Sequence, residues 1–144
     1  MRWSQPPASQ GFKSGAYPGR RSTQTPRQGV LARLLDDQSL GRVWLIDSGG
    51  ATVGYVVLIF SHSLEFDGRD AYVDEIYLQE RYRGRGLGPE ALLFAEGVCA
   101  ALGVRALHLG VDRNNRRARA AYLKAGFANR NHFLLTKRIA TLSG

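Results

Sequence analysis

The chain has 144 residues, of which 44% are hydrophobic and 22% charged, and its formal net charge is +8 at pH 7. This length and composition predict one soluble globular domain that is large enough to bury a core. Because no apolar run approaches the roughly 18 residues that a membrane helix needs, and the first residues lack the apolar stretch of a signal peptide, we expect a cytoplasmic protein with no membrane partner.

The N-terminal residues 1–28 are rich in Ser, Gln, Pro, Gly and Arg and contain few aliphatic side chains. Such a segment cannot bury enough apolar surface to offset the entropy lost on ordering. We therefore expect residues 1–28 to be disordered or loosely docked, ahead of a folded domain over residues 29–144.

The first half of this domain is predicted to contain a helix and a hairpin. Apolar residues at helical spacing predict a helix over residues 30–40. Residues 42–47 and 52–60 are predicted to be strands, because they are rich in aliphatic and aromatic residues and the Ser-Gly-Gly at residues 48–50 is typical of a tight turn between them. Residues 61–70 are expected to form a polar loop.

The second half alternates strands and helices. It is predicted to contain strands over residues 72–78, 106–111 and 132–138, and helices over residues 86–102 and 114–125. A hairpin followed by strand, helix, strand, helix and strand predicts an α/β protein of the mixed α+β type, in which helices pack on a mixed sheet.

The junction between the strand at residues 72–78 and the next helix carries the most informative pattern. Arginines and glycines alternate there: Arg81, Arg83, Gly84, Arg85, Gly86 and Gly88. Glycines let consecutive backbone N–H groups converge on one anion, while the helix N-terminus and the arginines add positive charge. The junction therefore predicts a phosphate-binding loop. Its spacing matches neither the Walker sequence nor the dinucleotide fingerprint, which disfavours nucleotide hydrolysis and a Rossmann fold.

Within this loop, Arg83-x-x-Gly86-x-Gly88 resembles the acyl-CoA pyrophosphate loop of the GNAT superfamily of N-acyltransferases. Further along the chain, Asn115-x-x-Ala118-x-x-x-Tyr122-x-x-x-Gly126-Phe127 resembles the block that follows this loop in the family. The resemblance extends over residues 30–139. It implies the GNAT fold, with a central mixed, largely antiparallel sheet flanked by helices. Relatives begin with an additional strand and one or two helices, of which residues 1–28 show no convincing version.

The resemblance also implies acetyl-CoA as the cosubstrate. The backbone groups of Ile76 and Leu78 would pair with the pantetheine amides as a further strand would. Asn115 would hydrogen-bond the cofactor, or it simply caps the helix beside it. The residues implied to hold the pyrophosphate are Arg83, Gly84, Arg85, Gly86, Leu87 and Gly88.

Transfer of an acetyl group to an amine needs a base, because an alkyl amine has a pKa of about 10.4 and is protonated at neutral pH. Asp74 and Glu75, on the strand before the loop, are the candidate bases. Successive strand residues point to opposite faces, so at most one of them faces the cleft, and the sequence does not choose between them. Tyr122 matches the family tyrosine that protonates the departing CoA thiolate, although a tyrosine at this spacing is also typical of a core aromatic.

The leading hypothesis is therefore an acetyl-CoA-dependent N-acetyltransferase that works by direct attack of a primary amine. The acceptor, a small molecule or a peptide, is not identified by the sequence. Family members are commonly dimers, which leaves a homodimer open. The histidines match no metal-ligand spacing, so we expect no metal, and the single cysteine, Cys99, is expected to be buried.

Two alternatives remain at this point. The chain is a catalytically inactive acyl-CoA-binding sensor or partner module, or it is a basic nucleic-acid-binding protein whose affinity falls with salt. The second alternative is disfavoured, because much of the positive charge clusters around the proposed CoA site.

Overall fold

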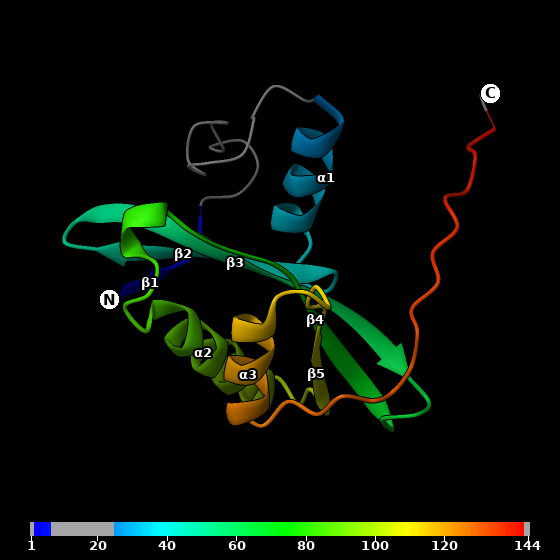
Figure 1. The fold of residues 1–144 in the computed structure, drawn as a ribbon. Helices are drawn as coiled ribbons and strands as arrows, with labels where there is room; N and C mark the ends of the chain where they lie inside the picture. The colour runs from blue at the N-terminus through cyan, green and yellow to red at the C-terminus, as the bar shows by residue number, and fades with distance from the viewer. Residues whose placement is uncertain (1, 7–24, 143–144) are drawn as a thin grey trace. The chain divides into compact units, whose positions relative to one another are not determined.

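The computed structural model describes residues 2–6 and 25–142 (Figure 1). The chain divides into a first unit, Met1–Gly110, and a second unit, Val111–Gly144. The first unit contains the sheet and two α-helices, and the second contains one α-helix and a C-terminal tail. None of the helices in the described ranges is long and apolar enough to cross a membrane.

A five-stranded sheet with strand order β1-β2-β3-β4-β5 forms the centre of the first unit (Figure 1). The strands from β1 to β4 pair antiparallel, and β5 pairs with β4 in parallel. The mixed, largely antiparallel sheet expected from the sequence is thereby confirmed. Its strands are β1 (Arg2–Ser4), β2 (Gly41–Ser48), β3 (Ala51–Ser63), β4 (Gly68–Leu78) and β5 (Ala106–Leu109).

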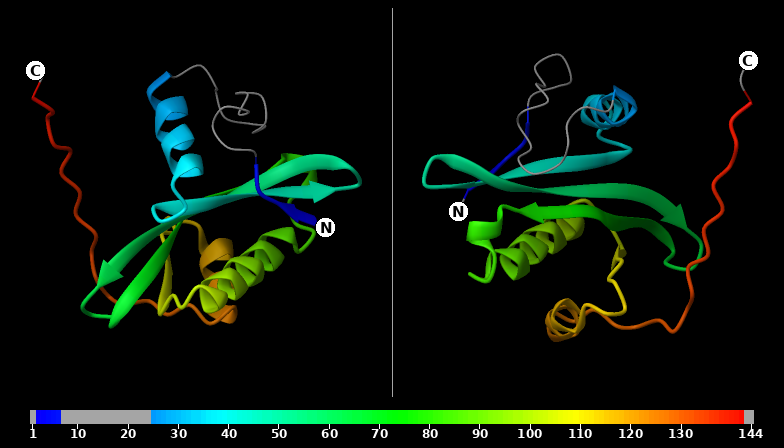
Figure 2. Two further views of the ribbon diagram at one scale, coloured as in Figure 1. Left: turned by 180° about the vertical axis from the view of Figure 1, so that it is seen from behind. Right: turned by 45° about the horizontal axis from the view of Figure 1, so that its top comes forward.

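One helix covers each face of this sheet, as the two views in Figure 2 show. On one face, α1 (Thr25–Asp36) inserts Leu34 into a core formed with β2 and β3. On the other face, α2 (Leu87–Ala101) buries Ala91 and Ala95 against the larger core. Burial of a whole aliphatic side chain contributes about 1.5–3 kcal/mol, so these two cores hold both helices on the sheet.

The first helix lies earlier in the chain than the predicted residues 30–40, because it ends at Asp36. The side chain of Asp37 accepts a hydrogen bond from the backbone N–H of Ser39 (3.0 Å), and the N–H of Leu40 donates to the carbonyl of Asp37 (3.1 Å). These local bonds offer the backbone an alternative to a further helical turn.

The opening strand β1 corrects the expectation that the N-terminus contains no such strand. Arg2–Ser4 pairs antiparallel with β2, and Trp3 stacks on Phe94 of α2 with ring centroids 4.1 Å apart. Trp44 meets the same phenyl ring edge-on at 5.5 Å. A three-residue strand is too short to show a periodic pattern, so the tertiary contact of one tryptophan decides its position. The rest of the expected segment, residues 7–24, lies outside the described residues.

The hairpin between β3 and β4 is longer than predicted. Much of the expected polar loop at residues 61–70 is strand, and the turn is confined to residues 64–67. Asp67 adopts a left-handed φ of 57°, and its N–H donates to the carbonyl of Leu64 (3.4 Å). Polar residues extend both strands here because they pair across the hairpin, as Ser61 does with Asp70.

The second unit contains α3 (Arg116–Lys124) and a tail without helix or strand over residues 127–142. The predicted strand over residues 132–138 is therefore wrong. Phe133, Leu134 and Leu135 are at least 77% exposed. The β-propensity of these residues does not suffice to form a strand, because a strand exists only when a neighbouring strand pairs with its backbone. No strand in the described ranges pairs with this segment.

Candidate active site

A β-bulge interrupts β4 at Asp74. In the pairing of β4 with β3, Val57 lies opposite Glu75 and the next residue, Leu58, lies opposite Val73. Asp74 is thus the extra residue of the strand. Bulges change the direction in which side chains point and are frequent beside active sites.

The bulge changes which residues of β4 face each side of the sheet. Before it, Ala71 and Val73 belong to the core beneath α2, and after it Ile76 and Leu78 do. Tyr77 belongs to the opposite core, beneath α1. A regular strand would keep residues 71, 73, 75 and 77 on one face, so the simple alternation assumed from the sequence does not hold across Asp74.

The same stretch of β4 has a backbone edge that no described strand covers, although the carbonyl of Leu78 accepts a hydrogen bond from the side chain of Arg83. β5 pairs only with Asp70–Val73, and β3 occupies the other edge of β4. From Asp74 to Leu78, no strand in the described ranges pairs with the edge on the β5 side. An open edge of this kind offers N–H and C=O groups to an extended ligand chain.

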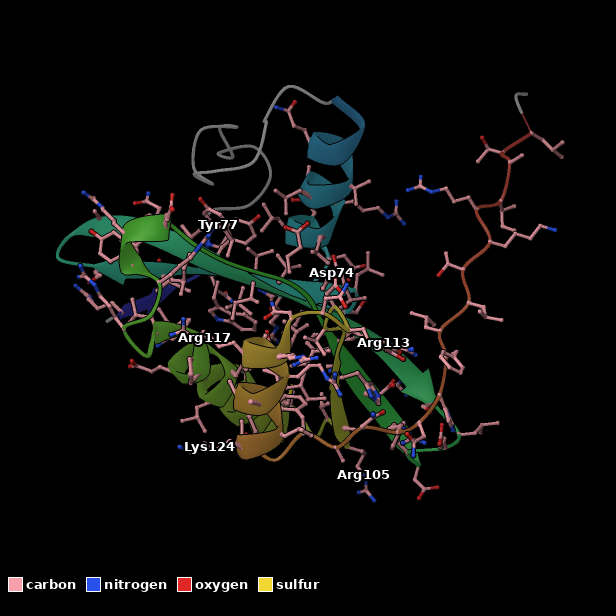
Figure 3. The ribbon with its side chains drawn as sticks, in the orientation of Figure 1. Asp74, Tyr77, Arg105, Arg113, Arg117 and Lys124 are labelled. Carbon is pink, nitrogen blue, oxygen red and sulfur yellow. The ribbon has the colours of Figure 1, made fainter. Side chains whose placement is uncertain are left out.

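The two candidate bases have different surroundings. Asp74 is exposed, and its carboxylate has no hydrogen-bond or ion-pair partner among the described residues. Glu75 is half-buried, and its Oε2 accepts a hydrogen bond of 2.8 Å from the hydroxyl of Tyr55, which is only 2% exposed. The ring of Tyr55 stacks on Tyr77 with centroids 5.6 Å apart. Figure 3 shows Asp74 and Tyr77 on β4.

Beyond β4, the chain enters the glycine-rich loop through a 3-10 turn, Glu80–Tyr82. Gly84 and Gly86 adopt left-handed φ values of 73° and 77°, which glycine reaches without steric cost. A Cβ built on either glycine would meet no described atom within 4 Å, so the space in front of the loop is open. Gly86 is also the N-cap of α2, and no side chain caps that helix end.

Three arginines surround this open helix end. The guanidinium groups of Arg81 and Arg85 lie over the ring of Tyr82, at 4.9 and 5.6 Å from its centroid. Nε of Arg83 donates a 3.0 Å hydrogen bond to the carbonyl of Leu78, which holds the side chain beside the end of β4. Three positive charges therefore stand near the helix N-terminus.

The loop and helix start fit an anionic ligand group such as a pyrophosphate. The first turn of α2, which begins with Leu87 and Gly88, presents backbone N–H groups that have no partners inside the helix. The helix dipole and the arginines favour negative charge at the same place. The predicted loop residues are thus gathered in the first unit, at the end of the open β4 edge. Their contacts with CoA remain predictions.

The other two predicted residues, Asn115 and Tyr122, belong to the second unit. The side-chain oxygen of Asn115 accepts a hydrogen bond from the N–H of Ala118 (3.1 Å), so Asn115 caps α3. Tyr122 is half-buried, and its ring lies 6.2 Å from that of Phe127, edge to face. Gly126 has a φ of 98°, and the N–H of Phe127 donates to the carbonyl of Tyr122 (3.0 Å). Together with the hydrogen bond from the N–H of Gly126 to the carbonyl of Leu123 (3.1 Å), this bond forms a Schellman motif, which terminates the helix.

Sequence reasoning missed two features of this site. The bulge at Asp74 depends on the register between β3 and β4, and the bond from Tyr55 to Glu75 depends on the same register. A single sequence carries no direct signal for either feature.

Among the described residues, no group of three or more His, Cys, Asp or Glu side chains is arranged to hold a metal ion.

Comparison with known proteins gives the family. The profile of the acetyltransferase (GNAT) family matches residues 10–127, which is most of the chain. The chain belongs to this family. The resemblance proposed from the loop and from the block around Tyr122 is therefore confirmed.

Individual relatives agree with this assignment. A thialysine N-epsilon-acetyltransferase from Bos taurus is 35% identical over 78 residues, which are 54% of this chain and 45% of the relative. The chain thus matches less than half the length of this GNAT relative. An integron cassette protein from the mobile metagenome of Cole Harbour salt marsh is 35% identical, with a TM-score of 0.70, over 79% of this chain and 70% of that one.

A solved structure of a more distant enzyme shares the fold. The aminoglycoside N-acetyltransferase AAC(6')-Iy, in complex with CoA, has a TM-score of 0.66 and 13% identity, over 80% of this chain and 88% of that one. Together with the mixed sheet, this likeness confirms the GNAT fold.

Proposed function

We propose that the chain is an N-acetyltransferase that moves the acetyl group of acetyl-CoA to a primary amine. The observation that carries this proposal is the continuous path from the bulged, open edge of β4 into the glycine- and arginine-lined start of α2. An extended arm that ends in a pyrophosphate has the shape and charge for such a path. Family membership supports acetyl-CoA as its source.

In the proposed donor site, the pantetheine arm pairs with the backbone of Ile76 and Leu78, as an added strand would. The pyrophosphate accepts hydrogen bonds from the loop and the first turn of α2 around Gly86. The arm then places the thioester beside Asp74, where the bulge leaves one strand residue unpaired with β3. Donor binding would therefore use mostly backbone groups and positive charge.

Asp74 is the proposed general base. A general base needs an oxygen lone pair that is free to accept the proton of the amine. The Asp74 carboxylate is exposed and has no hydrogen-bond or ion-pair partner in the described ranges. The carboxylate of Glu75 instead already accepts a hydrogen bond of 2.8 Å from the hydroxyl of the buried Tyr55. We therefore assign the proton transfer to Asp74 and a supporting role to Glu75.

The proposed reaction is a direct transfer. Asp74 takes one proton from the ammonium form, the amine nitrogen attacks the thioester carbonyl carbon, and the tetrahedral intermediate collapses by breaking the C–S bond. By its match to the family tyrosine, Tyr122 is the proposed donor of a phenolic proton to the departing CoA thiolate, and the proton lost by the new amide nitrogen replaces it.

No cysteine of the first unit offers a route through an acetyl-enzyme. Cys99 is 5% exposed in the core beneath α2. Burial, with a smaller contribution from the charge of Glu96, raises the pKa of its thiol, so the nucleophilic thiolate is disfavoured at neutral pH. This supports direct attack by the amine.

The acceptor is proposed to be a small-molecule or peptide amine. The name of the Bos taurus relative specifies the side-chain amine of thialysine, which supports a primary alkyl amine.

One observation favours a second candidate, a polyanion-binding protein. The second unit carries eight of the chain's 20 Lys and Arg residues but one of its 12 Asp and Glu residues. Figure 3 shows Arg117 and Lys124 on the same side of α3. A test of donor binding must therefore separate CoA from other polyanions.

Thermal unfolding with saturating acetyl-CoA tests the donor site. A ligand at a hundred times its dissociation constant adds about 2.7 kcal/mol of stability, which is expected to raise the Tm by about 5–10 °C. The variant Gly86→Asn is expected to lose this shift, because asparagine tolerates the left-handed backbone but its side chain fills the open space in front of the loop.

Gly97→Asn is the matched control, because Gly97 is an exposed residue of the same helix with no described atom near its added Cβ. This variant should keep the full shift. ADP and polyphosphate serve as ligand controls. Equal shifts with every polyanion would favour the second candidate, and no shift with acetyl-CoA would refute the proposed donor site.

A further inference from the structure

A buried carboxylate ties three strands together in the stretch where β5 pairs with β4, ahead of the opening that begins at Asp74. Asp70 of β4 is 3% exposed, and the hydroxyl of Ser61 on β3 donates a hydrogen bond to one of its carboxylate oxygens. Nε2 of His108, on β5, lies 3.0 Å from the other oxygen. Because a carboxylate only accepts, the imidazole donates this bond from Nε2. We call Asp70 and His108 the strand clasp.

Two aromatic rings hold the imidazole of the strand clasp in place. Tyr72 of β4 lies 4.6 Å from His108 between ring centroids, and Phe66 of the hairpin turn lies 4.9 Å away. The side chain of His108 is 18% exposed. Its orientation toward Asp70 is thus fixed by packing as well as by the hydrogen bond.

The strand clasp lies where β5 has little other support. The parallel pairing of β4 and β5 contains four residue pairs, from Asp70 with Ala106 to Val73 with Leu109. The next residue of β4 is the bulged Asp74, and there the two strands part. Short parallel pairings are individually weak, so a charge-assisted side-chain bond adds appreciably to this one.

We propose that Asp70 and His108 are positioning residues of the acetyl-transfer site. They hold β5 against β4 up to Val73. The point at which the two strands separate is thereby fixed, and with it the position of Asp74 and of the thioester proposed to lie beside it. This inference rests on the proposed function. Neither residue takes part in the chemical step.

The chain contains a matched control at the other edge of the sheet. The carboxylate of Asp47 on β2 accepts hydrogen bonds from Ser4 of β1 (3.0 Å) and from Thr52 of β3 (2.9 Å). It therefore bridges three strands as Asp70 does, but these strands are β1, β2 and β3, none of which faces the open edge of β4.

Three variants of the full chain test the proposal: His108→Leu removes the bond to Asp70, His108→Gln restores an N–H donor, and Thr52→Val removes a bond from the control carboxylate. Amide hydrogen exchange is measured without ligand, and kcat and the KM for acetyl-CoA are measured with a fixed amine. For His108→Leu, we expect about tenfold faster exchange over residues 106–109 and an approximately tenfold higher KM. His108→Gln should remain within about threefold of wild type in both.

Thr52→Val should leave the exchange of residues 106–109 and the KM for acetyl-CoA unchanged, although its Tm falls. Unchanged exchange in His108→Leu would overturn the strand clasp. Faster exchange with unchanged kinetics, or an equal rise in KM for Thr52→Val, would overturn its positioning role. A wild-type protein that neither binds nor turns over acetyl-CoA would refute the proposed function, and the exchange data would still decide whether His108 holds β5.

Discussion

Replacing Asp74 by Asn is expected to lower kcat by about 10²–10³-fold, because general-base catalysis by one carboxylate contributes an effect of this size. The affinity for acetyl-CoA should stay within a few-fold of wild type, because donor binding is assigned to the backbone of β4 and to the loop around Gly86. Asparagine keeps the size of the side chain at the bulge but cannot accept the amine proton. Steady-state kinetics with saturating acetyl-CoA, and calorimetric titration of the donor, measure the two quantities.

Glu75→Gln is the matched control. The amide oxygen of glutamine still accepts the hydrogen bond from Tyr55, so the fold beneath α1 is preserved. We expect kcat to fall by less than about fivefold. If Glu75→Gln is inactive and Asp74→Asn is not, the roles of the two carboxylates are the reverse of those proposed.

Replacing Tyr122 by Phe is expected to lower kcat by about 10–100-fold at unchanged acetyl-CoA affinity. The loss follows from the missing phenolic proton, which leaves the CoA thiolate to be protonated by water. Phenylalanine retains the ring contact with Phe127 that accompanies the end of α3, so the Tm should remain close to that of wild type. The measurement is kcat together with thermal unfolding.

An unchanged kcat in this variant would show that Tyr122 only packs against Phe127. A lower kcat accompanied by a large fall in Tm would attribute the defect to the fold of α3. Only the combination of lost turnover and retained stability supports a role as proton donor.

Much of the fold was predictable because its central strands carry strong local patterns. β2 and β3 contain runs of aliphatic and aromatic residues, β4 alternates such residues with shorter or charged ones, and the glycines before α2 indicate a loop with left-handed backbone. The spacing of Tyr122, Gly126 and Phe127 also has a local cause, since it is the signature of a Schellman helix end. Local patterns of this kind can be recognised without knowledge of the neighbours in space.

The remaining features depend on contacts between distant residues. β1 exists because Trp3 reaches Phe94, and the tail at residues 132–138 lacks a strand because β-propensity requires a pairing neighbour. The bulge at Asp74 is a property of register, which no single strand determines. For this reason the sequence identified Asp74 and Glu75 as candidate bases but did not distinguish their surroundings.

Amine-dependent release of free CoA from acetyl-CoA tests the proposed N-acetyltransferase activity most directly. The thiol is measured with a panel of small primary amines and lysine-containing peptides, and the mass of the intact protein is recorded after incubation with acetyl-CoA alone. We predict that at least one amine accelerates CoA release and is recovered as its acetamide, with no acetyl group attached to the protein. Tight binding of acetyl-CoA without release for any amine would contradict the proposal and would indicate an acyl-CoA-binding module instead.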